Sequence, residues 1–194
     1  MKALYEMLGS FCKAVAAGQI EIYNEFSLQH ELGLFLRERL PSCKVQFERN
    51  VSFFFPEGRA FTKREIDIAI FSPDQKVLAY AIELKYPRNG QYPEQMFSFC
   101  KDIAFLEELR EAGFHSAALV IFAEDRPFYA GKPDGIYGYF RGGKPLRGRI
   151  EKPTGAKDDA VDLKGSYTVE WRPVANPLRC AIIPVGHEPM SAMQ

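Results

Sequence analysis

The sequence predicts a mixed α/β fold, in which strands form the centre and helices pack around them. Two helical patterns, at residues 24–40 and 93–112, flank three strand-like stretches, and a fourth strand-like run follows. The composition is ordinary for a globular protein, with 46% hydrophobic and 26% charged residues. At 194 residues the chain is expected to form one domain, 1–194, with a sizeable core.

Whole-chain properties exclude several classes of protein. The formal net charge is zero, so any affinity for nucleic acid must come from locally segregated charge. No run of about 18 apolar residues is present, so no membrane span is expected. The four cysteines include no C-x-x-C pair, which predicts reduced, packed thiols in a cytoplasmic protein rather than a disulfide framework or a zinc site.

The first eighteen residues resemble a secretory leader only superficially. Lys2 precedes apolar residues, but Glu6 and Lys13 interrupt the apolar stretch. The apolar residues recur at helical spacing, which predicts an amphipathic helix instead of a signal peptide.

The helix at 24–40 follows from a leucine stripe that ends before Pro41. Strands are expected at 44–55, 64–71 and 77–85, and the turn signals PEGR and SPDQ between them indicate an antiparallel meander.

The second half of this core has equally clear signals. The helix at 93–112 ends at Gly113, a residue suited to a left-handed cap. The continuous apolar run at 117–123 is typical of a central strand covered on both faces.

The composition changes after residue 125, which defines a basic, glycine-rich extension at 126–194. Residues 126–157 hold seven of the chain's 15 glycines, and eight basic against two acidic residues give them a net charge of +6. Short strands are expected at 138–141, 167–172 and 179–185.

Two carboxylates are expected to meet on the sheet. Strand alternation places Asp67 on one face of its strand, and Glu83 and Lys85 on one face of the next. The opposite face of the first of these strands is expected to hold its isoleucines, Ile66, Ile68 and Ile70. If the SPDQ hairpin pairs the two strands, Asp67 and Glu83 lie near each other.

Adjacent carboxylates repel and raise each other's pKa unless a cation neutralises them. Mg²⁺ or Mn²⁺ suits this role, because such ions prefer carboxylate and carbonyl oxygens, and the Leu84 carbonyl offers a further ligand. Lys85 beside the ion can orient or deprotonate a water, or offset charge on a phosphate. The alternative is a solvated polar face of an antiparallel sheet, in which these charges form only weak cross-strand pairs.

Asp67, a gap of fifteen residues and then Glu83-Leu84-Lys85 resemble the D-(x)n-E-x-K signature of the PD-(D/E)XK nuclease superfamily. The predicted element order over 20–125 also resembles its restriction-endonuclease-like αβββαβ core, here with an added N-terminal helix and a C-terminal β-rich extension. Ile66 stands where the superfamily name has proline, which is not a ligand. The resemblance implies a nuclease that uses Mg²⁺ or Mn²⁺ to hydrolyse phosphodiester bonds, with DNA as the expected substrate ahead of RNA.

Two further site residues follow from the resemblance. Some branches carry a glutamine on the helix after E-x-K, and Gln95 occupies that place, with Asp102 seven residues on and on the same helical face. Gln95 is expected to hold a water or a substrate phosphate, or otherwise to face solvent. Many members place a glutamate on the first core helix, and Glu25 is in phase with the leucine stripe, with Glu31 in reserve.

The basic extension is the expected nucleic-acid surface, because it interleaves cations with aromatic residues that can stack on bases. The candidate phosphate contacts are Arg141, Lys144, Arg147, Arg149 and Lys152. The alternative is a solvated surface loop. A homodimer is left open, and so is a second function: a non-catalytic module of the same fold that binds nucleic acid or protein.

Overall fold

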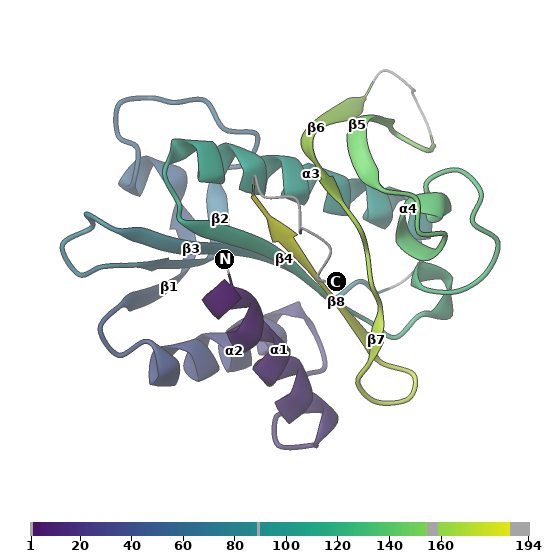
Figure 1. The fold of residues 1–194 in the computed structure, drawn as a ribbon, viewed down its shortest axis with the longest axis horizontal. Helices are drawn as coiled ribbons and strands as arrows, with labels where there is room; N and C mark the ends of the chain where they lie inside the picture. Colours follow the sequence, from purple (N-terminus) through teal and green to yellow (C-terminus); the bar gives the residue numbers. More distant parts are fainter. Residues whose placement is uncertain (1, 89, 155–158, 187–194) are drawn as a thin grey trace, which may run out of the picture.

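The computed structural model describes residues 2–88, 90–154 and 159–186, which form a mixed α/β fold built on one six-stranded sheet (Figure 1). The α-helices are α1 (Lys2–Ala16), α2 (Glu25–Arg39), α3 (Tyr92–Ala112) and α4 (Tyr137–Arg141). The strands are β1 (Lys44–Asn50), β2 (Glu65–Phe71), β3 (Leu78–Lys85), β4 (Ser116–Ala123), β5 (Leu146–Glu151), β6 (Ala160–Tyr167), β7 (Arg172–Pro173) and β8 (Arg179–Val185). Short 3-10 helices occur at Val51–Phe53 and Arg126–Phe128.

The six-stranded sheet has the order β1-β2-β3-β4-β8-β7. β1, β2 and β3 form the predicted antiparallel meander, and α3 then carries the chain over to β4, which pairs with β3 in parallel. β8 pairs antiparallel with the other edge of β4, so the predicted apolar strand is central and all its residues are buried. The predicted mixed α/β class is confirmed, and so is the order of helix, three strands, helix and strand.

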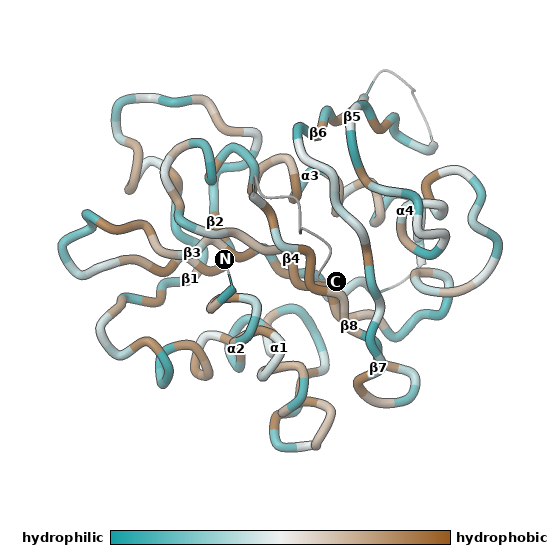
Figure 2. The backbone as a smooth tube through the Cα atoms, in the orientation of Figure 1, coloured by the Kyte–Doolittle hydropathy of each residue, from teal (hydrophilic) through white to brown (hydrophobic). Residues whose placement is uncertain are grey.

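Helices cover both faces of the sheet. Figure 1 shows α1 and α2 on one face and α3 on the other, where β5, β6 and α4 also lie. Two hydrophobic clusters correspond to these two layers, and both reach β2, β3, β4 and β8. In Figure 2 the most apolar part of the backbone runs through the centre of the sheet, along β4 and β8.

Local signals explain where the helices begin and end. Asn24 caps α2, because its side chain accepts a hydrogen bond from the Ser27 amide while the Ser27 hydroxyl accepts one from the Asn24 amide. Gly113 ends α3 with a φ of +128°, as its sequence position predicts. The first helix is also confirmed, with Leu4, Leu8 and Phe11 buried. No helix among the described residues is long and apolar enough to cross a membrane.

Several predicted elements need correction. The strand expected at 44–55 ends at Asn50, whose side chain caps a 3-10 turn by accepting from the Ser52 amide. Residues 138–141 belong to helix α4 instead of a strand, and residues 168–171 separate β6 from β7. The hairpin of β5 and β6 was not predicted, because glycines and charges hide its alternation.

The isoleucines of β2 are also divided between the faces. Ile68 and Ile70 pack with α1 and α2, as predicted together, but Ile66 packs in the cluster of α3. The irregularity lies next to Asp67, and opposite it on β1 Glu48 has a φ of +48°. Simple two-residue alternation therefore fails at this end of β2.

Candidate active site

β2 and β3 separate at the point where the two predicted acids lie. Their backbone pairing ends with Ile68 opposite Ile82. Beyond that pair, Asp67 Oδ2 accepts a hydrogen bond of 2.7 Å from the Leu84 amide, and Glu83 Oε1 accepts one of 3.3 Å from the Asp67 amide. Each carboxylate is therefore held by the backbone of the opposite strand, and the two acids converge.

A lysine from the β1–β2 connection joins the acids. Glu83 is fully buried, and its Oε2 contacts the ammonium of Lys63. The same ammonium lies 2.8 Å from Oδ1 of Asp102, a buried residue of α3. Lys85 Nζ lies 3.3 Å from Asp102 Oδ2. The result is a cluster of three acids and two lysines between the sheet and α3.

Burial dominates the electrostatics of the acids. It raises the pKa of Asp67 from 3.8 to about 6, and the nearby positive charge of Lys85 offsets only part of the effect. Burial also raises the pKa of Glu83 well above its ordinary value, and the charges of Asp67 and Asp102 raise it further. Because the charged forms of Asp67 and Glu83 are unfavourable here, binding of a proton or of a cation stabilises the site.

Burial lowers the pKa of the two lysines, but the charges of the nearby carboxylates outweigh it. Burial alone lowers the pKa of Lys85, but the charges of Asp102, Glu25 and Asp67 outweigh it, so the net pKa is raised. Lys85 is therefore a charged ammonium at neutral pH. An ammonium donates hydrogen bonds and attracts anions, but it accepts no proton from water.

Glu25 lies beside this cluster, whereas the side chains of Glu31 and Gln95 form their contacts elsewhere. Glu25 begins α2, and its Oε2 accepts a 3.1 Å hydrogen bond from the amide of Tyr86, the residue after Lys85. Glu31, kept in reserve, pairs instead with His30 at 3.2 Å.

Gln95 supports the loop before α3. Its Nε2 donates to the carbonyl of Arg88 at 2.9 Å and to that of Gly90 at 2.5 Å. The residue of α3 that contacts Lys63 and Lys85 is Asp102, which had been placed on the same helical face as Gln95.

Lys63 and Gln29 are site residues that the sequence analysis missed. Gln29 Nε2 donates to the Asp67 carbonyl at 2.9 Å and to Glu48 Oε1 at 2.5 Å, which ties α2 to the irregular end of β2. Lys63 carries no signal, since the path of the connection at 54–64 cannot be read from sequence. Asp102 does carry one, because it is an acid within the apolar stripe of α3.

A divalent ion such as Mg²⁺ needs several oxygen ligands around one point. Among the described residues, no group of three histidines, cysteines or acids is arranged to hold a metal. Asp102 Oδ2 is nevertheless buried without a hydrogen-bond partner, so Lys85 neutralises it only at a distance. The Leu84 carbonyl points to the same strand edge as the Leu84 amide, toward Asp67. Carboxylate and carbonyl oxygens are the ligands that a hard cation prefers, so these groups could bind one once the Lys63 ammonium moves away from Glu83.

The predicted phosphate contacts fall into two groups. Arg141 is committed internally, because its guanidinium donates to the carbonyls of Pro127, Ala130 and Lys132 and lies over the ring of Tyr137. The remaining four, Lys144, Arg147, Arg149 and Lys152, lie on the surface or partly so.

Three of these cations surround one hollow. Lys144, Arg149 and Lys152 line a cavity of about 480 Å³, together with Glu151 and Tyr139. The Lys144 ammonium lies 4.3 Å from the centre of the Tyr139 ring. Arg149 forms only an exposed pair with Asp162 at 3.4 Å, and Lys152 lies 4.0 Å from Glu94 at the start of α3. The hollow therefore combines positive charge with an aromatic face.

Comparisons of the chain with models of protein families, with curated proteins and with solved structures found no match.

Proposed function

We propose that the protein is a metal-dependent nuclease that hydrolyses phosphodiester bonds in DNA, with RNA as the second candidate substrate. The observation that carries the proposal is the convergence of Asp67, Glu83 and Lys85 where β2 and β3 separate. The meander, α3 crossover and parallel β4 agree with a restriction-endonuclease-like core. Buried carboxylates of raised pKa beside a charged lysine are typical of a functional site.

Asp67, Glu83 and the Leu84 carbonyl are the groups that would hold Mg²⁺ or Mn²⁺. The bound ion supplies positive charge that stabilises the negative charge on a phosphate during displacement. Lys85 binds a phosphate oxygen and offsets its charge, a role that fits its raised pKa better than that of a base. Glu25 and Asp102 keep this ammonium charged and in place.

Substrate binding is assigned to the basic hollow and its surroundings. Lys144, Arg147, Arg149 and Lys152 would contact backbone phosphates, and the Tyr139 ring would stack on a base once the Lys144 ammonium that lies over it turns to a phosphate. Arg141 has a structural role instead, because its guanidinium already donates hydrogen bonds to three backbone carbonyls.

One observation favours a second candidate, a non-catalytic module that binds nucleic acid or protein. Lys63 neutralises Glu83 and Asp102 from within the chain, so the acids are compensated without any ion. In such a module the charges serve the structure, and ligands bind at the basic hollow.

A cleavage assay separates the two functions. Labelled single- and double-stranded DNA and RNA would be incubated with Mn²⁺, with Mg²⁺ or with EDTA, using the wild type, Glu83→Gln and Lys85→Met. Lys101→Met is the matched control, since Lys101 pairs with Asp159 on the outer side of α3. We expect metal-dependent cleavage by the wild type and the control, and a loss of about 100-fold or more in the two site variants. Equal cleavage by all four proteins would overturn the nuclease proposal, and DNA binding without cleavage in any metal would establish the module.

A further inference from the structure

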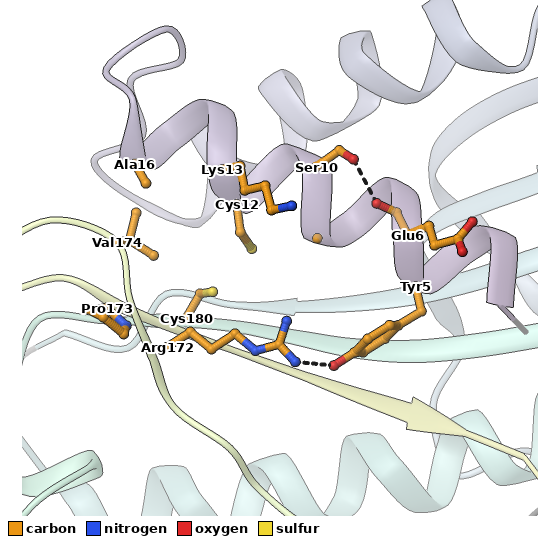
Figure 3. Close-up of a pocket in the computed structure, with 11 residues that line it drawn as sticks. Tyr5, Glu6, Ser10, Cys12, Lys13, Ala16, Arg172, Pro173, Val174 and Cys180 are labelled. Carbon is orange, nitrogen blue, oxygen red and sulfur yellow. Dashed lines mark hydrogen bonds between the residues drawn. The ribbon is translucent and has the colours of Figure 1, made fainter. Parts of the chain in front are cut away.

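A second hollow lies far along the sheet order from β2, between α1 and the β7–β8 edge (Figure 3). Its volume is about 380 Å³. Two of the chain's four cysteines line it, Cys12 from α1 and Cys180 from β8. The proposed nuclease chemistry uses neither thiol, so their arrangement needs a separate explanation.

The backbone brings the two thiols and one cation together. Arg172 of β7 is the cross-strand partner of Cys180, so their side chains share one face of the sheet. α1 packs on that face, so Cys12 and Cys180 line the same hollow. In Figure 3 Cys12 points from the helix toward the sheet and Cys180 points from β8 toward the helix. Arg172 is fixed by its 2.6 Å hydrogen bond to the Tyr5 hydroxyl.

This environment gives the two thiols different reactivity. The nearby Cys12 thiol lowers the pKa of Cys180, and the charge of Arg172 lowers it further against the opposing effect of burial. The nearby Cys180 sulfur and burial raise the pKa of Cys12, and the charge of Arg172 offsets part of this rise. The other charged groups that line the hollow, Glu6 and Lys13 of α1, have opposite signs.

A third buried thiol shows what happens without such partners. Burial and the charge of Asp102 raise the pKa of Cys100 to about 12, so it carries almost no thiolate at neutral pH. Arg172 lies directly opposite Cys180, so Cys180 is the sulfur better placed to react as a thiolate, and Cys12 faces it from α1.

We propose that Cys180 and Cys12 form a dithiol site that hydroperoxides oxidise to a disulfide joining β8 to α1. The Cys180 thiolate attacks one peroxide oxygen; the S–O bond forms, the O–O bond breaks and the leaving alkoxide or hydroxide takes a proton. The Cys12 sulfur then attacks the sulfenic sulfur; the S–S bond forms, the S–O bond breaks and water leaves with the Cys12 proton. In total two thiols and one hydroperoxide yield one disulfide, one alcohol or water from the peroxide, and one water.

The direct test is intact-mass analysis of the reduced full-length protein after treatment with one equivalent of hydrogen peroxide. We expect a mass lower by two hydrogen atoms, reversed by dithiothreitol, and a Cys12–Cys180 linked peptide after digestion. The oxidised protein is expected to melt at a higher temperature, because the cross-link closes a very long loop. Cys43→Ser is the matched control, since Cys43 lies outside the hollow, and it is expected to oxidise as the wild type does.

Single variants assign the roles of the two sulfurs. Cys12→Ser is expected to stop at a Cys180 sulfenic acid that dimedone traps, whereas Cys180→Ser is expected to leave Cys12 reduced. Arg172→Met is expected to slow oxidation at pH 7 several-fold and to approach the wild-type rate at higher pH, where the thiolate forms without help. The proposal is overturned if the wild type keeps both thiols while Cys43 is oxidised, or if Cys12 reacts equally well without Cys180.

Discussion

Replacing Lys63 by methionine removes the internal cation from two buried carboxylates but keeps most of the side-chain volume. At 2.8 Å and an effective dielectric constant of about 20, its attraction to Asp102 amounts to about 6 kcal/mol before desolvation is subtracted. Removal of one partner from a buried ion pair costs about 3–5 kcal/mol in net stability. Because the Lys63 side chain is 32% exposed, water compensates part of the loss, and we expect about 3 kcal/mol.

The measurement is urea unfolding in EDTA between pH 5 and pH 8. Without Lys63 the pKa of Glu83 rises further, so the folded state binds a proton that the unfolded state releases. Stability of the variant must then fall as pH rises, and its deficit against the wild type must shrink toward pH 5. Lys76→Met is the control, since Lys76 forms only an exposed pair with Asp74, and it is expected to change stability by less than about 0.5 kcal/mol.

The same variant tests whether an ion can take the place of the ammonium. Mn²⁺ at one hundred times its dissociation constant adds about 2.7 kcal/mol to a protein that binds it only when folded. We expect Mn²⁺ to restore most of the stability of Lys63→Met and to stabilise the wild type less, because Lys63 competes. If Lys63→Met unfolds at the wild-type urea concentration at every pH, the reasoning about buried charge at this site is wrong.

Asp67→Asn is expected to stabilise the metal-free protein by about 1–3 kcal/mol at pH 7 but not at pH 4. The pKa of Asp67 is raised from 3.8 to about 6, so its charged form lowers the stability of the folded state increasingly as pH rises above 3.8. Urea titrations at both pH values measure the difference. Gly33→Ala is expected to lower the unfolding free energy by about 1–3 kcal/mol, because the added Cβ would stand 2.1 Å from the Phe47 ring. Thermal melts measure this loss against the control Gly9→Ala, whose added Cβ meets no atom within 4 Å. The double change Arg149→Gln and Lys152→Gln is expected to weaken DNA binding and to lower the salt slope of log Kd by about 2, measured by fluorescence anisotropy across salt concentrations.

The core could be predicted because its signals are local and redundant. The run at 117–123 is apolar throughout, and the helix at 93–112 has both a periodic stripe and a terminal glycine. The acids on β2 and β3 were predicted to converge from alternation and one hairpin. They do converge, although alternation fails at Ile66, because each carboxylate bonds to the backbone of the opposite strand.

The remaining parts depend on tertiary contacts that leave no local pattern. Lys63 reaches Glu83 and Asp102 because the connection at 54–64 contacts α3, where the Thr62 amide donates to Glu108. The hairpin of β5 and β6 is held by Glu107 of α3, which accepts from two of its backbone amides and from the Tyr167 hydroxyl. Glu107 lies 57 to 60 residues from these partners in the chain.

The position of β8 has a consequence for how the protein reaches its folded state. β4 is synthesised well before β8, and until β8 arrives one full edge of an eight-residue apolar strand has no hydrogen-bonding neighbour. An open edge of this kind readily recruits strands from other molecules. Solubility during synthesis therefore depends on how soon the last strand docks, and a chain cut before residue 179 should aggregate even though both site acids are present.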